Sequence, residues 1–544
     1  SPVECFKHWV QHCPDKVYLR QPEGDQWHTL SWKQANEQVC AMAASLARFP
    51  EGSRIAIYSL NCAHWILADL AILMAGHISV PIYPTANQKT VSQIMDHSGS
   101  CAIFIGKLPV ATQLPVFNEK VECFSFFSPR ENTLYWDEMV AESIKQGLRC
   151  PEVEVNEQDL LTLVYTSGTT GQPKGVMLPY RAIFKAIECV GGVIKLTEDE
   201  KYFSYLPLAH IAERMVVEMN SLYHGGEISF VESLDTFAKN LTDTEPTIFF
   251  GVPRIWVKLM QGVQKRLGGR WLSNVLLNTP ILGGALKKKI IQGMGFGKLK
   301  YAISAAAAIS PEVIHWFKNL GVDIYEVYGL SETSGISNMN SPDGIKIGSV
   351  GRAIPESDIR LSEDGEVLIR SPNVMDGYYN APDLTDIAIQ DGWFRTGDLG
   401  VIDEEGYLSI TGRAKEIFKS AKGKYISPTP IEAHLQPALA VEQLIVTGAE
   451  LPQPVAIAVI IDETIWQDRK TAQKKLQKIV QEVNVRLEPH ERLSHLLIVK
   501  REWDIERGLM TPTLKLRRQQ IEDLYKLDIK NLHKNKPIVW IEEN

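Results

Sequence analysis

The sequence has no paired-cysteine motif. Its eight cysteines all lie at or before Cys189, are widely spaced and include no C-x-x-C pair. This spacing excludes a disulfide framework and a zinc ribbon. It indicates free thiols in a reducing compartment.

Long apolar runs and a leader segment are also missing. The most apolar stretch, WILADLAILMAG (65–76), contains Asp69 and is too short to span a bilayer. The chain begins SPVECFKHWV, without a basic segment followed by an apolar one. We therefore expect a soluble, intracellular, cytoplasmic protein.

The sequence also lacks positive charge in excess, internal repeats and low-complexity runs. Its formal net charge of −8 argues against a general nucleic-acid binder, so we expect no nucleic-acid partner. The apolar fraction of 44% and the charged fraction of 22% are those of a globular protein with ample core material. A chain of 544 residues is long enough for more than one domain.

The N-terminal part alternates short apolar strands with helices. A strand over 53–60 (SRIAIYSL) precedes a buried helix over 61–76 and further strands at 77–84 and 101–106 (CAIFIG). The same alternation returns in TIFFGVP (247–253), YAISAAAAIS (301–310) and DIYEVYGLSE (323–332). Strand, helix and strand in short steps predict a parallel α/β sheet.

From about Lys346 the pattern changes. Residues 359–371 and 400–413 both place an acidic-Gly turn between alternating strands, so we expect β-hairpins. A Lys-rich region with its own strands and helices follows Arg413. We therefore predict an α/β fold: an N-terminal domain over 1–412, built of α/β sheets plus a small β-barrel-like part, and a smaller α+β C-terminal domain over 413–544.

A Gly-rich segment, TSGTTGQPKG (166–175), follows the apolar, β-prone run DLLTLVY. Glycines let backbone N–H groups converge on one point, and hydroxyls and Lys174 add donors, which is the composition of a polyphosphate cradle. An ordinary solvent loop is the alternative. The spacing is not G-x-x-x-x-G-K-[ST], because Pro173 precedes Lys174 and Gly175 follows it.

Six segments in fixed order carry a resemblance. They are this loop, YEVYGLSET (325–333), GYYNAPDLT (377–385), WFRTGDLG (393–400), GRAKEIFKSAKGKYISP (412–428) and TPTLKLRR (511–518). Together they resemble the adenylate-forming, or AMP-binding, family of acyl-CoA synthetases, luciferases and peptide-synthetase adenylation domains. The segments LPLAHIAER (206–214) and VPRIW (252–256) are most similar to its long-chain fatty acyl-CoA branch.

The resemblance implies a two-step reaction that uses ATP, Mg²⁺ and, as co-substrate, CoA. A fatty acid carboxylate attacks the α-phosphate of ATP to give acyl-AMP and pyrophosphate, and the CoA thiol then displaces AMP. Two rivals stay open: a ligase that passes its acyl-AMP to a carrier protein, and a non-catalytic acyl- or nucleotide-binding protein on the same scaffold.

The resemblance also implies a nucleotide site. Its members are Thr166, Ser167, Gly168, Thr169, Thr170, Gly171, Ala305, Tyr328, Gly329, Asp398 and Arg413. Tyr328 is expected to stack on adenine and Asp398 to accept the ribose hydroxyls. Glu332 and Thr166 are expected to hold Mg²⁺, and Lys174 to act on the phosphates. The alternative is that Asp398 is an ordinary turn residue before Leu399.

Lys515 is the main catalytic candidate. The resemblance implies that its ammonium lies between the acyl carboxylate and the α-phosphate and offsets developing charge. The alternative is that Lys515 belongs to a solvated basic face. Because Lys515 belongs to the C-terminal domain, the resemblance implies that this domain is mobile, pivoting at Lys415.

Three residues are expected at the acyl group: His210, which is also a catalytic candidate, Trp256 and Ala305. His210 and Glu213 lie at H-x-x-E spacing, but two ligands do not make a zinc site. Where the family usually reads Ser-Gly-Ala-Ala-Pro, this chain has SAAAA (304–308). We expect the added Cβ of Ala305 to crowd the acyl group.

Residues 265–300 hold eight basic side chains, no acid and an apolar stretch between them. We expect this segment to attach peripherally to anionic lipid on the inner face of a membrane. A solvated helix face or a contact to CoA phosphates is the alternative. The sequence leaves the oligomeric state open.

Overall fold

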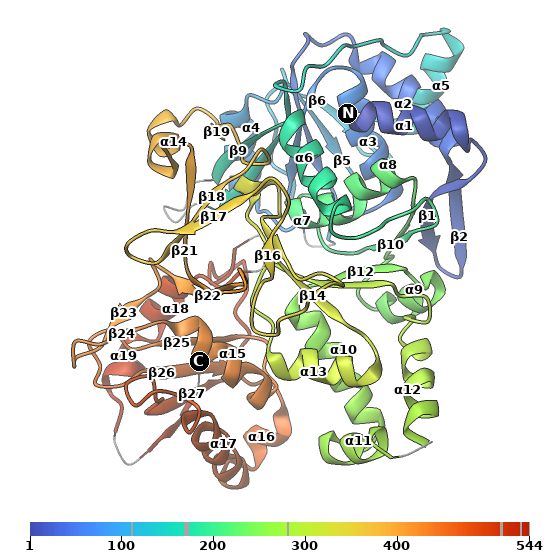
Figure 1. Cartoon of the computed structure of the whole chain (residues 1–544). Coiled ribbons are helices and arrows are strands. Elements are labelled where there is room, and N and C mark those ends of the chain that lie inside the picture. Colours follow the sequence, from blue (N-terminus) through green and yellow to red (C-terminus); the bar gives the residue numbers. More distant parts are fainter. Residues whose placement is uncertain (110–111, 168–172, 280–281, 512–514, 534–535, 543–544) are drawn as a thin grey trace.

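The computed structural model describes residues 1–109, 112–167, 173–279, 282–511, 515–533 and 536–542. Two large sheets and a smaller antiparallel one occupy the chain up to residue 413. The C-terminal part builds its own sheets, coloured orange to red in Figure 1. Within the described ranges, no helix combines the length and the apolar character needed to cross a bilayer.

The eight-stranded sheet carries the strand that leads into the Gly-rich segment. Its order is β19 (Gly377–Tyr378), β9 (Pro173–Pro179), β8 (Leu160–Ser167), β4 (Ile78–Ile82), β3 (Arg54–Tyr58), β5 (Ala102–Ile105), β6 (Glu122–Ser125) and β7 (Leu134–Tyr135). β3 pairs in parallel with β4 and β5, and these apolar strands are buried, which confirms the predicted parallel sheet. β8 and β9 instead form an antiparallel pair.

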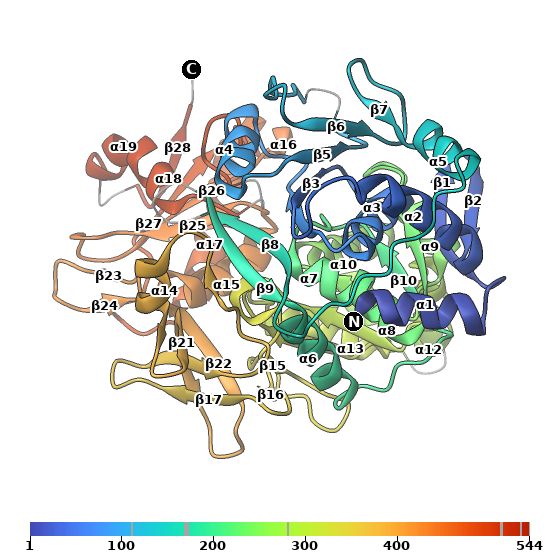
Figure 2. The ribbon, with the colours of Figure 1, turned by 90° about the horizontal axis from the view of Figure 1, so that it is seen from above.

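Helix α3 (Ala63–Met74) is apolar and buried on nearly every side. It packs against β3 and β4 of this sheet and against β1 (Val17–Glu23) of the next (Figure 2). A helix that is apolar all round has to be covered all round, so α3 joins the two sheets into one core.

The second sheet has nine strands. Its order is β16 (Arg352–Ala353), β15 (Asn338–Met339), β14 (Ile324–Tyr328), β13 (Tyr301–Ser304), β12 (Ile248–Gly251), β10 (Lys201–Ser204), β11 (Glu227–Phe230), β1 and β2 (Gln26–Ser31). β12, β13 and β14 run in parallel. Because strands are pleated, successive side chains along each strand point to opposite faces of the sheet. One side packs on α10 (Pro253–Arg266) and α13 (Pro311–Leu320).

Both hairpins predicted after Lys346 are confirmed. β17 (Asp358–Leu361) pairs with β18 (Glu366–Arg370), and β21 (Trp393–Ile402) pairs with β22 (Leu408–Arg413), all antiparallel. With β20 (Ile389–Gln390) they form a five-stranded sheet where we predicted a barrel-like part. In the β21–β22 register, Asp398 lies opposite Arg413.

The C-terminal part has its own core. A four-stranded sheet contains β25 (Leu444–Thr447), β26 (Val455–Val459), β27 (His495–Val499) and β28 (Ile538–Ile541). Helices α15 (Pro428–Leu439) and α17 (Arg469–Asn484) pack on it and on each other. The protein is thus a mixed α/β molecule with a large N-terminal and a smaller C-terminal domain. The boundary that we predicted falls at the end of β22.

Candidate active site

Three parallel strands end at one edge of the nine-stranded sheet, where ligands bind in open α/β folds. β12 ends at Gly251, β13 at Ser304 and β14 at Tyr328. Glu332 lies in the short 3₁₀ turn Ser331–Thr333 directly after β14. Gly329 allows this turn, because a Cβ there would lie 2.3 Å from the backbone of Gly335.

Asp398, Arg413 and Tyr328 form a cluster at this edge. Arg413 Nε lies 3.1 Å from Asp398 Oδ1, and the Tyr328 hydroxyl donates to Asp398 Oδ2 at 2.7 Å. The Asp398 side chain is 6% exposed, whereas that of Arg413 is 53% exposed. Burial, and then the neighbouring Asp398 carboxylate, raise the pKa of Tyr328 well above its usual value. The structure thus brings together three predicted nucleotide-site residues.

A second cluster links the ends of β8, β9 and β19. Thr166 lies opposite Lys174 in the β8–β9 register. The Lys174 ammonium lies 5.2 Å from the centre of the Tyr378 ring, and the Tyr378 hydroxyl donates to Glu332 Oε1 at 2.8 Å. The predicted phosphate and metal residues therefore converge. Gly168, Thr169, Thr170 and Gly171 lie outside the described residues, and the same holds for the Ser167 side chain.

Tyr378 is a site residue that sequence reasoning missed. It belongs to the segment 377–385 that helped to carry the resemblance, but nothing in that segment showed which side chain it touches. Burial, and then Glu332, raise the pKa of Tyr378, so its hydroxyl keeps its proton and remains a donor to Glu332.

Lys515 reaches these clusters from the C-terminal domain. Its backbone N–H donates to Thr511 Oγ1 at 3.0 Å, and its carbonyl accepts from the Thr511 N–H at 2.8 Å. Residue 515 is exposed to solvent, although protein atoms of both domains surround it. The resulting desolvation, followed by the positive charge of Arg413, lowers the pKa of Lys515, while Glu332 and Asp398 oppose the shift.

His210 begins the short helix α7 (Ile211–Glu213). Its Nδ1 accepts from the Ala212 N–H at 3.2 Å, which leaves Nε2 as the donor of the neutral ring. Burial, and then Lys515, lower the pKa of His210 to about 3. His210 is therefore neutral at physiological pH and able to donate a hydrogen bond. Glu213 accepts from Ser204 Oγ and from the Tyr205 N–H, both at 3.0 Å.

An apolar cavity, part of it open to solvent, adjoins the strand ends. Its lining comes from strands β10, β12, β13 and β14, from helix α6 (Tyr180–Gly191) and from the π-helical turn η1 (Arg214–Met219). Ala305 lines it, as do Gly335 and Ile336 beyond Glu332. Such a cavity suits an extended apolar ligand.

Trp256 does not line this cavity, and its predicted place at the acyl group stays a prediction. Its side chain is fully buried on the opposite face of the sheet, packed against Phe249, Phe296 and Phe317. Its indole N–H donates to the Gly251 carbonyl at 2.9 Å. Trp256 is a core residue.

The segment SAAAA contains a strained backbone position that we did not predict. Ala306 has φ 71°, a left-handed conformation that glycine adopts more readily. Ala305, the residue predicted to be crowded, is 7% exposed in the cavity wall.

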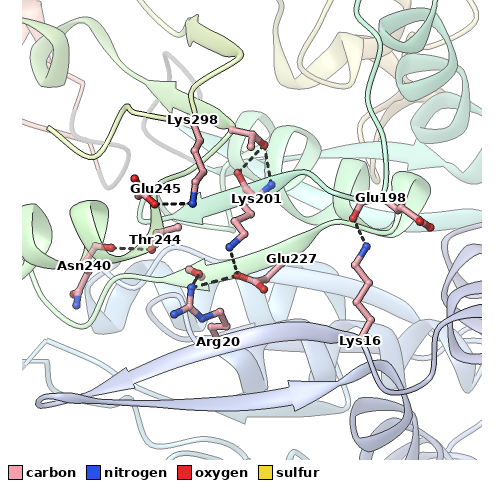
Figure 3. A network of polar contacts seen from close by, with 11 residues as sticks. Lys16, Arg20, Glu198, Lys201, Glu227, Asn240, Thr244, Glu245 and Lys298 are labelled. Carbon is pink, nitrogen blue, oxygen red and sulfur yellow. Dashed lines mark hydrogen bonds and ion pairs between the residues drawn. The ribbon is translucent and has the colours of Figure 1, made fainter. Parts of the chain in front are cut away.

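Part of the basic segment 265–300 is neutralised by acids from other elements. Arg270 pairs with Glu312, Lys298 with Glu245 at 2.7 Å (Figure 3) and Lys300 with Glu200 at 2.8 Å. Lys287 donates to Asn319. The other four, Lys265, Arg266, Lys288 and Lys289, are exposed and make no ion pair within the described part of the chain.

Lys415 lies exposed in the turn after β22. The two domains touch close to this turn, where the Ser427 hydroxyl donates to the Thr411 carbonyl at 2.6 Å, and also further away. Glu442, after α15, pairs with Arg254 of α10 and lies 2.8 Å from Lys258 of the same helix. A more polar pocket opens where Glu442 meets Arg254 and Lys258, and both domains line it.

Comparison with known proteins gives two family matches. The model of the AMP-binding enzyme matches residues 6–379, and that of the AMP-binding enzyme C-terminal domain matches residues 416–537. The chain is 28% identical over 570 residues to a long-chain-fatty-acid–CoA ligase, FadD15, of Mycobacterium bovis, covering 96% of this chain and 95% of that protein.

Solved structures share the fold. The adenylation domain of a carboxylate reductase from Mycobacterium chelonae superposes with a TM-score of 0.82 at 20% identity, covering 97% of this chain and 90% of that one. O-succinylbenzoate coenzyme A synthetase from Bacillus subtilis, solved with ATP and a magnesium ion, gives a TM-score of 0.72 at 21% identity, covering 95% and 99%.

Proposed function

The chain belongs to the AMP-binding enzyme family, whose model matches well over half of it, and on this premise we propose that it is an ATP-dependent long-chain fatty acid–CoA ligase. The proposal rests mainly on one arrangement: Glu332 and Asp398 of the N-terminal domain act electrostatically on Lys515 of the C-terminal domain. Val327 and Ser334, on either side of Glu332 in the sequence, line the apolar cavity. A protein that only bound nucleotide or acyl groups would not need a lysine presented there by a second domain.

ATP is expected to lie across the two polar clusters. Tyr328 offers a flat face to adenine, and Asp398 retains lone pairs for the ribose hydroxyls. Lys174, with Thr166 opposite it, offers donors and positive charge to the phosphates. Glu332 and Thr166 supply the oxygen ligands that Mg²⁺ prefers. A bound Mg²⁺ would neutralise phosphate charge.

In the first step the fatty acid carboxylate forms a bond to the α-phosphorus, and the bond to pyrophosphate breaks. Two anions meet, so positive charge at the transition state accelerates the step. Lys515 supplies that charge. The neutral His210 can donate through Nε2 to the carboxylate, which orients the nucleophile without protonating it.

In the second step the thiol sulfur of CoA forms a bond to the acyl carbon, the bond to AMP breaks, and the thiol proton is lost. We assign CoA rather than a carrier protein as the acceptor because Arg254 and Lys258 line the pocket between the domains. If Glu442 withdraws when the C-terminal domain moves, both cations become available to CoA phosphates.

Peripheral membrane attachment from the cytoplasmic side is part of the proposal. The unpaired Lys265, Arg266, Lys288 and Lys289 lie on α10 and α12 (Leu282–Gly293), and α11 (Arg270–Leu277) between them exposes Leu272 and Val275. Basic and apolar side chains together favour an anionic bilayer surface. Co-sedimentation should require anionic vesicles and weaken with salt; equal binding to neutral vesicles would contradict attachment by charge.

Pyrophosphate release from hexadecanoate, ATP and Mg²⁺ tests the proposal. Lys515→Ala should lose this step by on the order of 10²-fold, typical of removing a transition-state charge, yet still convert supplied hexadecanoyl-AMP to the thioester. Lys478→Ala, on the exposed face of α17, is the matched control. Equal loss of both half-reactions in Lys515→Ala would refute its role. If only a carrier-protein thiol releases AMP, the acyl acceptor is a carrier protein and not CoA.

A further inference from the structure

Tyr378 contacts two site residues of opposite charge. Its hydroxyl donates to Glu332 Oε1 at 2.8 Å, and the Lys174 ammonium lies over its ring, 5.2 Å from the ring centre. An ammonium within about 6 Å of a ring centre is attracted to the electron-rich face of the ring. The ring of Tyr378 therefore holds the cation, while its hydroxyl holds the carboxylate.

Lys174 and Glu332 keep their charges free. Neither makes an ion pair with any other residue in the described ranges, and Glu332 Oε2 has no hydrogen-bond partner there. Lys174, Glu332 and Tyr378 are all half-buried, so a ligand can reach them. One carboxylate oxygen is therefore left for a cation such as Mg²⁺, which prefers oxygen ligands.

The backbone around Tyr378 ties the two charged residues to one framework. Tyr378 belongs to β19, which pairs with β9, the strand that contains Lys174. The Met375 N–H, just before β19, donates to the Glu332 carbonyl at 2.8 Å. The segment 375–378 thus holds Glu332 by its backbone and by its side chain, and it is anchored beside Lys174.

The ring of Tyr378 also keeps the two charges apart. Both contact the same side chain, so they are near neighbours, and without the ring between them they could form a direct ion pair. In such a pair the ammonium would offer less positive charge to phosphates, and the carboxylate would be a poorer ligand for a cation. A nucleotide would then have to separate them before it could bind.

We propose that Tyr378 is a positioning residue of the nucleotide site, which keeps Lys174 available to the phosphates of ATP and Glu332 Oε2 available to Mg²⁺. This inference rests on the proposed ligase function, because that function brings the nucleotide and the cation to these residues. Tyr379 offers a matched comparison. It is the next residue and is also half-buried, but its ring packs against His97, with the ring centres 5.9 Å apart.

The test measures the equilibrium binding of α,β-methylene-ATP, which cannot release pyrophosphate, by calorimetry at a series of Mg²⁺ concentrations. Tyr378→Phe keeps the ring, so binding without Mg²⁺ should change little. The Mg²⁺ concentration for half-maximal effect should rise by about tenfold or more, typical of removing a group that holds a metal ligand. Tyr379→Phe should change neither quantity. An equal Mg²⁺ dependence in the two variants would overturn the proposal.

Tyr378→Leu removes the ring as well, so Lys174 and Glu332 can pair, and binding without Mg²⁺ should weaken several-fold. Glu332→Gln should then strengthen this binding more in Tyr378→Leu than in the unmodified protein, a comparison that cancels its general effect on the phosphates. Equal gains in both backgrounds would overturn the separation of charges. If Tyr378→Leu does not fold, the comparison of the two phenylalanine variants decides. No binding of the analogue to the unmodified protein would instead contradict the ligase function.

Discussion

Glu442→Gln tests whether the ion pairs between the domains hold them in the arrangement described here. Glu442 pairs with Arg254 and Lys258, and the substitution keeps its size while removing its charge. In this arrangement Glu332 and Asp398 act electrostatically on Lys515, so we propose that it is the one suited to adenylation.

The magnitude follows from the exposure of these pairs. Glu442 is 33% exposed, Arg254 40% and Lys258 51%, so each pair is worth about 0.2–1 kcal/mol. Two such pairs favour the arrangement by about 0.4–2 kcal/mol, which is a roughly 2- to 30-fold change in the ratio of two conformations.

The assay measures the two half-reactions separately, as pyrophosphate release without CoA and as thioester formation from supplied hexadecanoyl-AMP. In Glu442→Gln the ratio of the rate of thioester formation to the rate of pyrophosphate release should rise by roughly 2- to 30-fold. High salt should produce the same rise in the unmodified protein and little in the variant. Glu482→Gln on α17 is the control. An unchanged ratio at low salt would show that these ion pairs do not hold the domains in this arrangement.

Three further substitutions test other parts of the account. Lys415→Pro fixes φ near −65° at the predicted pivot, so adenylation should survive while thioester formation collapses; normal overall turnover would exclude this pivot. Ala306→Gly should raise the free energy of unfolding in urea by about 1 kcal/mol, because φ 71° strains alanine, whereas Ala307→Gly should not; equal effects would contradict the strain. Arg214→Met leaves the buried carboxylates of Asp69 and Glu218 unpaired and should lower that free energy by about 3–5 kcal/mol; a loss below 1 kcal/mol would show that the carboxylates repack or take up protons.

Local patterns were enough to predict much of the fold. Buried parallel strands such as β3 consist of continuous apolar residues, and acidic-Gly turns such as Asp364–Gly365 mark hairpins whatever lies around them. These features depend on neighbours in the sequence, so they can be read without knowing the tertiary structure.

The contacts that depend on distant segments could not be predicted. Trp256 follows a strand end, and no local pattern shows which face of the sheet it covers. The basic segment looked unpaired because its acids, such as Glu245 and Glu312, belong to other elements. The role of Tyr378 depends on its hydrogen bond to Glu332, which belongs to a distant segment of the chain.

We propose that the protein activates a long-chain fatty acid with ATP and transfers it to CoA. CoA consumption, measured with ATP and Mg²⁺ over carboxylic acids from acetate to chains of twenty carbons, tests this function. Consumption should be confined to long chains, should be matched by equal AMP and pyrophosphate, and should fall by about 10²-fold in Lys515→Ala. No CoA consumption with any long chain, or full consumption in Lys515→Ala, would contradict the account.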